Sequence, residues 1–98
     1  MNKVSEIELT KDLVRRARLL ELAGNPTRIR IFCILFERGE TCVSDIAASL
    51  QMSIASISHH LQMMRDNELL EAVRMGNKIC YKPVKGELMN KLKKLICE

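Results

Sequence analysis

The cysteines and histidines of this chain are its candidates for binding a soft metal or zinc, and the cysteines are also its candidates for reversible oxidation. Cys33, Cys42, Cys80 and Cys97 are widely separated and form no Cys-x-x-Cys pair. This spacing excludes a zinc ribbon and differs from the disulfide framework of a small secreted protein. In the reducing cytoplasm that we expect for this chain, the cysteines start as thiols.

The two histidines are consecutive in sequence. On a helix, His59 and His60 cannot share a face, so no two-histidine metal site is predicted there, and His60 is expected to be structural or exposed. No cysteine with a histidine base, paired carboxylates or phosphate-binding loop is recognisable. The sequence therefore predicts neither an enzyme nor a bound cofactor.

A helix predicted from Ile54 to about Asp66, with Ser53 as its N-cap, has one apolar and one polar face. Its apolar positions are Ile57, Leu61 and Met64, and the opposite face carries Ala55, Ser58, His59 and Gln62. Short polar side chains on an exposed helix face can donate to or accept from base edges in a DNA major groove. We predict base contacts from Ser58, His59 and Gln62.

A basic hairpin follows this helix. Strand-like runs at 69–74 and 78–84 flank a turn at 75–77 that contains Gly76 and Asn77. Arg74 and Lys78 on the hairpin, and Arg65 at the helix end, are predicted to contact phosphates. A hairpin placed after a groove-reading helix is a wing.

The remaining segments read as helices that support this unit. Helical spacing covers 9–22, 26–36 after an Asn25 cap and Pro26, 43–50, and 85–97. The predicted fold is mainly α, a winged helix-turn-helix with five helices and a two-stranded wing. At 98 residues it forms one domain, 1–98, and so small a domain gains stability by forming a homodimer.

Charge and hydropathy limit the classes of partner that we expect for this protein. The net charge of +4 favours an acidic partner such as double-stranded DNA, although many other proteins are as basic. Residues 1–10 lack the apolar core of a signal peptide, and no uncharged run is long enough to span a membrane. We therefore expect a cytoplasmic protein with no membrane partner.

Three segments resemble the ArsR/SmtB family of bacterial and archaeal repressors: NPTRIRI at 25–31, CVSDIA at 42–47 and SHHLQMMRD at 58–66. The resemblance covers nearly the whole chain. It implies a homodimer joined through the first and last helices, which leaves its operator when an inducer binds. The groove-reading positions of the family correspond to Ile54, Ala55, Ser56, Ser58 and His59; Ile54 and Ala55 depart from the polar residues often found there, so the operator sequence stays open.

The resemblance also suggests where an inducer could act. The zinc site that some members build on the last helix is excluded, since 85–98 holds no histidine or aspartate. The thiol-rich metal site of other members has Cys-Val-Cys-Asp where this chain has Cys42-Val43-Ser44-Asp45. A soft metal or metalloid ion would then need Cys80 or the other subunit, and this site is kept as an alternative.

Cys33 and Cys97 correspond to the paired cysteines of the persulfide- and redox-sensing branch of the family, and the leading hypothesis is that they are sensing thiols. Oxidation or inserted sulfur atoms would join them and loosen DNA binding. Two further alternatives stay open: purely structural cysteines, because free cysteine is often buried as a small hydrophobe, and a helix-turn-helix that binds protein only. Cys80 is expected to be a packing residue.

Overall fold

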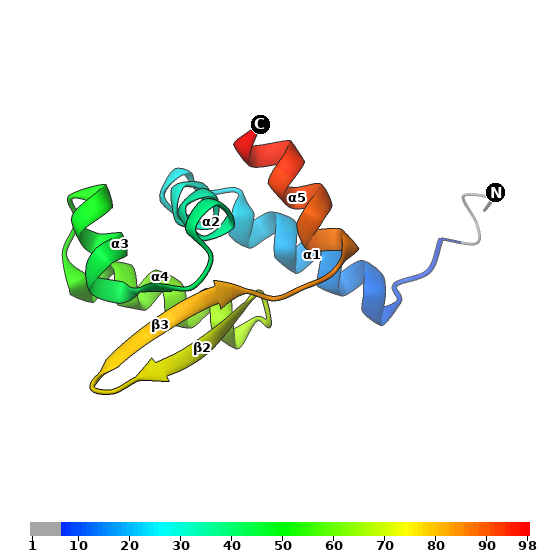
Figure 1. Cartoon of the computed structure of the whole chain (residues 1–98). Helices are drawn as coiled ribbons and strands as arrows, with labels where there is room; N and C mark the ends of the chain where they lie inside the picture. Colours follow the sequence, from blue (N-terminus) through cyan, green and yellow to red (C-terminus); the bar gives the residue numbers. More distant parts are fainter. Residues whose placement is uncertain (1–6) are drawn as a thin grey trace.

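The computed structural model describes residues 7–98, and it contains five helices and a three-stranded antiparallel sheet within that range. Most of the segment 1–10, on which the signal-peptide argument depended, lies outside the described residues. The winged helix-turn-helix predicted from the sequence is confirmed (Figure 1). The elements are α1 (Lys11–Ala23), α2 (Pro26–Arg38), β1 (Thr41–Cys42), α3 (Val43–Leu50), α4 (Ile54–Asp66), β2 (Leu70–Met75), β3 (Lys78–Pro83) and α5 (Glu87–Cys97).

Side-chain caps decide where three of the helices begin. Asn25 Oδ1 accepts from the backbone N–H of Arg28 at 3.1 Å, and Ser53 Oγ accepts from that of Ser56 at 3.1 Å, which confirms both predicted N-caps. Thr10 Oγ1 caps α1 in the same way, with 3.0 Å to the N–H of Leu13. This cap explains why α1 begins at Lys11, two residues later than the hydrophobic periodicity indicated.

The sheet has one strand more than predicted. No helix or strand was predicted at 40–42, but Thr41 and Cys42 form β1 and pair with Tyr81 and Cys80 of β3, so the order is β1-β3-β2. A two-residue strand is too short to show alternation in sequence. The predicted two-stranded wing is confirmed as the β2–β3 hairpin, and the sheet has a third, very short strand that also pairs with β3.

The wing turn has the geometry that its glycine allows. Met75 and Lys78 are paired across a two-residue loop, and Gly76 takes a φ of +66° at the first loop position. Such a φ is favoured by glycine and suits the II′ turn of tight hairpins. Beyond the other elements, the hairpin extends as a free arm (Figure 1).

One apolar core joins all the elements except the wing tip. Buried residues come from each helix, and Ile31, Phe32, Leu35, Ile46, Ile57, Leu61 and Met64 are fully buried. The outer helices α1 and α5 leave some of their apolar side chains exposed. In α1, Leu19 and Leu22 are buried while Leu20 is 59% exposed. Helical spacing in 85–97 predicts an apolar face of Leu88, Leu92, Leu95 and Ile96, and this is partly wrong, because Met89 is buried and Leu95 is 71% exposed. No helix in the range 7–98 is long and apolar enough to cross a membrane.

Candidate nucleic-acid interface and cysteine pairs

The two faces of α4 differ as the sequence indicated. Ile57, Leu61 and Met64 have no exposed surface, and they anchor the helix in the core. On the other side His59 and Gln62 are exposed and Ser58 is half-buried. Gln62 Nε2 donates to Ser58 Oγ at 3.0 Å, one helical turn away, so these polar groups already share a hydrogen bond.

The start of α4 presents small and apolar groups. Ile54 is 59% exposed at the first position of the helix, Ala55 is exposed, and Ser56 is half-buried. An exposed isoleucine and alanine can contact a thymine methyl group but cannot read a base edge through hydrogen bonds. The hydrogen-bonding part of the face is therefore its middle, at Ser58, His59 and Gln62.

The predicted phosphate ligands lie in two places. Arg74 and Lys78 are exposed on the hairpin, where Lys78 borders the turn and Arg74 pairs with Ile79. Arg65 is exposed near the end of α4, and its guanidinium forms an ion pair of 3.1 Å with Asp66. This neighbouring carboxylate reduces the charge that Arg65 could offer to a phosphate, so the wing residues are the freer cations of the three.

His60 is half-buried behind the polar face. Its Nδ1 is buried and has no hydrogen-bond partner among the described residues. Burial lowers the pKa of His60 below its ordinary value, and the positive charge of Arg28 and the nearby His59 lower it further. Arg28 is held close by, since its Nε donates to the carbonyl oxygen of Leu22 at 2.7 Å. The expected structural role agrees with this setting.

Cys33 and Cys97 are joined in a disulfide that links α2 to the last residue of α5. Their Cα atoms are 5.6 Å apart, within the range that a disulfide needs, and both side chains are half-buried. The Sγ of Cys33 also lies 3.7 Å from the carbonyl oxygen of Ile96. The two positions singled out by resemblance are thus brought together across 64 residues of chain.

Cys42 and Cys80 form a second disulfide, which the sequence did not suggest. They are direct partners in the β1–β3 register, and Cys80 is 1% exposed while Cys42 is half-buried. The expectation that Cys80 is only a packing residue is therefore wrong, although Cys80 is buried as that expectation implied. All four cysteines are paired in this structure, which therefore describes the oxidised form of both pairs.

Within residues 7–98, no group of three or more cysteine, histidine or acidic side chains could hold a metal ion. The alternative site at Cys42 has one thiol neighbour, Cys80, within the same chain. Two thiolates could hold a soft ion only when this disulfide is reduced.

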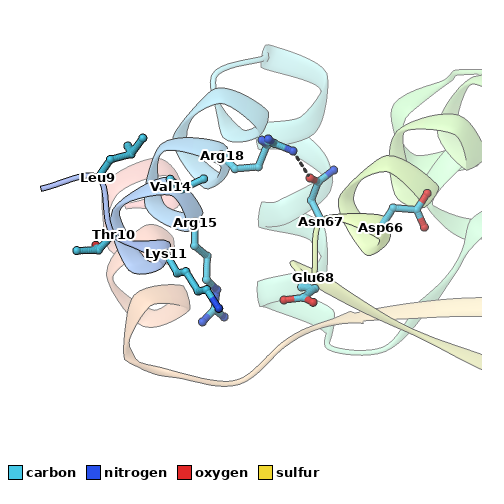
Figure 2. Close-up of a pocket in the computed structure, with 9 residues that line it drawn as sticks. All are labelled: Leu9, Thr10, Lys11, Val14, Arg15, Arg18, Asp66, Asn67 and Glu68. Carbon is cyan, nitrogen blue, oxygen red and sulfur yellow. Dashed lines mark hydrogen bonds between the residues drawn. The ribbon is translucent and has the colours of Figure 1, made fainter.

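A hollow of about 540 Å³ lies between the start of α1 and the end of α4 (Figure 2). Arg18 Nη1 donates across it to Asn67 Oδ1 at 3.0 Å. None of the residues predicted to bind DNA or to sense a signal lines this hollow. Its lining is Leu9, Thr10, Lys11, Val14, Arg15, Arg18, Asp66, Asn67 and Glu68.

Known proteins are similar to this chain in sequence and in fold. The profile described as "Bacterial regulatory protein, arsR family" matches residues 25–72. A curated relative, the transcriptional repressor SmtB homolog of Synechocystis, is 31% identical over 74 residues, which cover 76% of this chain and 55% of the relative. This chain thus spans little more than half the length of that protein.

Two solved structures are similar over most of both chains. The AntR antimony-specific transcriptional repressor is 30% identical with a TM-score of 0.74, covering 97% of this chain and 88% of its own. The homodimeric winged helix-turn-helix domain of Mb0332 from Mycobacterium bovis is 29% identical with a TM-score of 0.77, covering 98% and 86%. With the matching profile, the wing and the two faces of α4, these similarities show that the chain belongs to the arsR family of bacterial regulatory proteins.

Proposed function

We propose that this protein is a homodimeric repressor that binds operator DNA and leaves it when a persulfide, polysulfide or oxidant joins Cys33 to Cys97. The observation that carries the DNA-binding part is the two-faced α4: three fully buried apolar side chains fix the helix, and polar side chains point outward beside a wing. A regular major groove admits one such helix. DNA is therefore the partner that this surface fits best.

Specific and non-specific contacts are divided between α4 and the wing. Ser58, His59 and Gln62 have hydrogen-bonding groups for base edges, whereas Arg74 and Lys78 are long cations at the free end of a hairpin. Cations that touch phosphates hold the protein in register and make binding sensitive to salt. A net charge of +4 agrees with such an interaction. A protein-binding module would show no steep salt dependence with DNA.

The proposed dimer uses α1 and α5. Leu13, Val14 and Leu20 of α1 and Leu95 of α5 are 40% to 71% exposed, so they form an apolar surface on the outer helices. An apolar groove of about 230 Å³ runs between these helices, lined by Leu19, Leu20, Leu88, Leu92 and Leu95 with Arg16 and Lys91. Burying such a surface in a second copy stabilises a small domain.

The proposed switch depends on where the Cys33–Cys97 bond lies. It joins α2, which contacts α3 and β3, to α5, which belongs to the proposed dimer surface. A bond there couples the dimer helices to the helices that place α4. Forming it removes two electrons and two protons from the thiols, which the oxidant accepts. Oxidation would thus change the spacing of the two α4 helices in the dimer and weaken operator binding.

The test uses a DNA fragment from upstream of the protein's own gene. Reduced protein should bind it, and polysulfide or an oxidant should release it. Cys33→Ser and Cys97→Ser should each keep binding and lose the release, with Cys42→Ser as the control that still responds. If a Cys33→Ser protein is still released, the α2–α5 pair is not the sensor, and if no salt-dependent binding occurs, the repressor function itself is wrong.

A metal- or metalloid-responsive repressor is the second candidate. Cys42 and Cys80 would supply two thiolates when reduced, and AntR, a similar structure, is named an antimony-specific repressor. Release of the reduced protein from DNA by antimonite, arsenite or cadmium, abolished in Cys42→Ser but not in Cys33→Ser, would favour this candidate. Cysteines that respond to neither class of signal would be structural.

A further inference from the structure

We infer that Cys42 and Cys80 form a second thiol–disulfide couple, which clamps the DNA-reading part of the chain and is separate from the proposed Cys33–Cys97 switch. The β1–β3 register places the two cysteines directly opposite one another. They lie 38 residues apart in sequence, and the closed loop contains α3, α4 and β2. We call this enclosed unit, with the wing turn, the reading unit (residues 42–80). This inference about Cys42 and Cys80 does not depend on which signal releases the protein from DNA.

The strand pair that the bond restrains is short. β1 has two residues, and Cys42 is also the residue before α3, where its side chain makes no capping hydrogen bond. Short ladders with few hydrogen bonds open more easily than the core. Without the bond, β1 is held to β3 only by this short ladder and by the packing of the buried Tyr81, which pairs with Thr41.

The bond limits this opening in two ways. It ties the N-terminal end of α3 to the middle of β3, whose Cys80 also pairs with Val73 of β2. It also closes a long loop, which reduces the conformational entropy of the unfolded chain. Because β1 and β3 pair at these two residues, the crosslink joins strands that the backbone ladder already places side by side. The oxidised couple should therefore stabilise the reading unit.

Access to the two sulfur atoms dictates the order of the chemistry. Cys80 is 1% exposed and Cys42 is half-buried, so an external reagent meets Cys42 first. With a low-molecular-weight disulfide such as oxidised glutathione, the Cys42 thiolate attacks one sulfur and releases one glutathione thiolate. The Cys80 thiolate then attacks Cys42 Sγ in the mixed disulfide and releases the second. Two protein thiols are oxidised and one small disulfide is reduced to two thiols.

The experiment isolates the couple in a Cys33→Ser/Cys97→Ser protein that is reduced and then placed in a glutathione redox buffer. The intact mass should fall by two hydrogens with no linked dimer, and trypsin should release peptide 39–65 joined to peptide 79–85. The oxidised form should melt roughly 10 °C above the reduced form. A crosslink without any rise in melting temperature would overturn the clamp, and separate glutathione adducts on both cysteines would overturn the couple.

Two single changes in the same background test the order of attack. With Cys80→Ser, Cys42 should accumulate as a mixed disulfide and the melting temperature should not rise. With Cys42→Ser, Cys80 should stay unmodified while the protein is folded; its rapid modification would contradict entry through Cys42. Because these readouts involve no DNA, failure here is distinct from failure of the repressor proposal.

The wild-type protein supplies a measurement that needs no variant to fold. After oxidation, trypsin should release two separate linked pairs, peptide 39–65 with 79–85 and peptide 31–38 with 95–98. Exchanged pairs, with Cys42 joined to Cys33 or Cys97, would overturn the assignment of two independent couples.

Discussion

At the scale of single residues, His60 is a polar group whose surroundings favour its neutral form. Its Nδ1 is buried without a partner in the described part of the chain, and the positively charged Arg28 lies nearby. Burial comes first among the causes that lower the pKa of His60, followed by Arg28 and His59. Just below the ordinary histidine pKa, His60 is therefore neutral in the folded protein but protonated in the unfolded chain.

This difference makes stability depend on pH. The contribution of His60 is present above the ordinary histidine pKa and is lost as the pH falls below it, because the unfolded chain then binds the extra proton. We expect the melting temperature to fall between about pH 7.5 and about pH 5.5. His60→Gln should reduce this fall, while His59→Gln should keep most of it. An equal fall in His60→Gln and the unmodified protein would exclude His60 as the cause.

The reading residues make a second prediction at this scale. Ser58→Ala with His59→Ala should weaken binding to the upstream DNA fragment much more than binding to unrelated DNA, because base contacts carry sequence information. Arg74→Ala should weaken both alike, since phosphates are common to all sequences. Competition binding at several salt concentrations measures both effects. Equal losses on the two DNAs in the Ser58/His59 variant would contradict our assignment of the groove face.

At the scale of elements, the position of α4 depends on its first turn as well as on the core. Ser53 Oγ satisfies the N–H of Ser56, while the preceding residues turn through Gln51 with a φ of +55°. A cap at this point sets where the helix begins and how Ile54 and Ala55 are presented. The tight turn between α3 and α4 therefore ends in a defined helix start.

Removing this cap has a predictable cost. Ser53→Ala should lower the free energy of unfolding by about 1 kcal/mol, since it leaves one of the first N–H groups of α4 without its partner. Ser44→Ala, at an exposed position inside α3, is the matched control and should change stability by less than about 0.5 kcal/mol. Urea unfolding of the reduced proteins measures both. No difference between the two variants would mean that the cap adds nothing to stability.

At the scale of the whole molecule, the exposed apolar side chains of α1 and α5 form the surface on which we propose that a second copy packs. Leu20 is 59% exposed, so a charge placed there should not disturb the core. Leu20→Glu should shift the protein from dimer to monomer in sedimentation and weaken DNA binding, because two linked α4 helices bind far better than one. Ile79→Glu, which alters an exposed residue of the wing, should stay dimeric. A dimeric Leu20→Glu protein would place the interface elsewhere.

Local features of the sequence were enough to predict most of the elements. The caps at Asn25 and Ser53, Gly76 in the wing turn and the apolar spacing of α4 depend on neighbours within a few residues. The polar face with Ser58, His59 and Gln62 follows from the same helical spacing. The start of α1 was misplaced although its cap at Thr10 is local. The buried face of α5 and the strand β1 depend on what packs against them, and these were the parts predicted least well.

The cysteines show the difference between what the sequence predicts and what only the tertiary structure decides. Resemblance to a family indicated Cys33 with Cys97. Cys42 and Cys80 were connected only as possible ligands of one soft ion, because nothing local predicts a bond between residues 38 positions apart. Only the return of β3 along a two-residue strand brings them opposite one another. The sequence alone determined the helices, the wing and the polar face, since short-range periodicity and capping encode them. The tertiary structure decided the second disulfide and the uncovered apolar surfaces, because long-range pairing depends on how the whole chain packs.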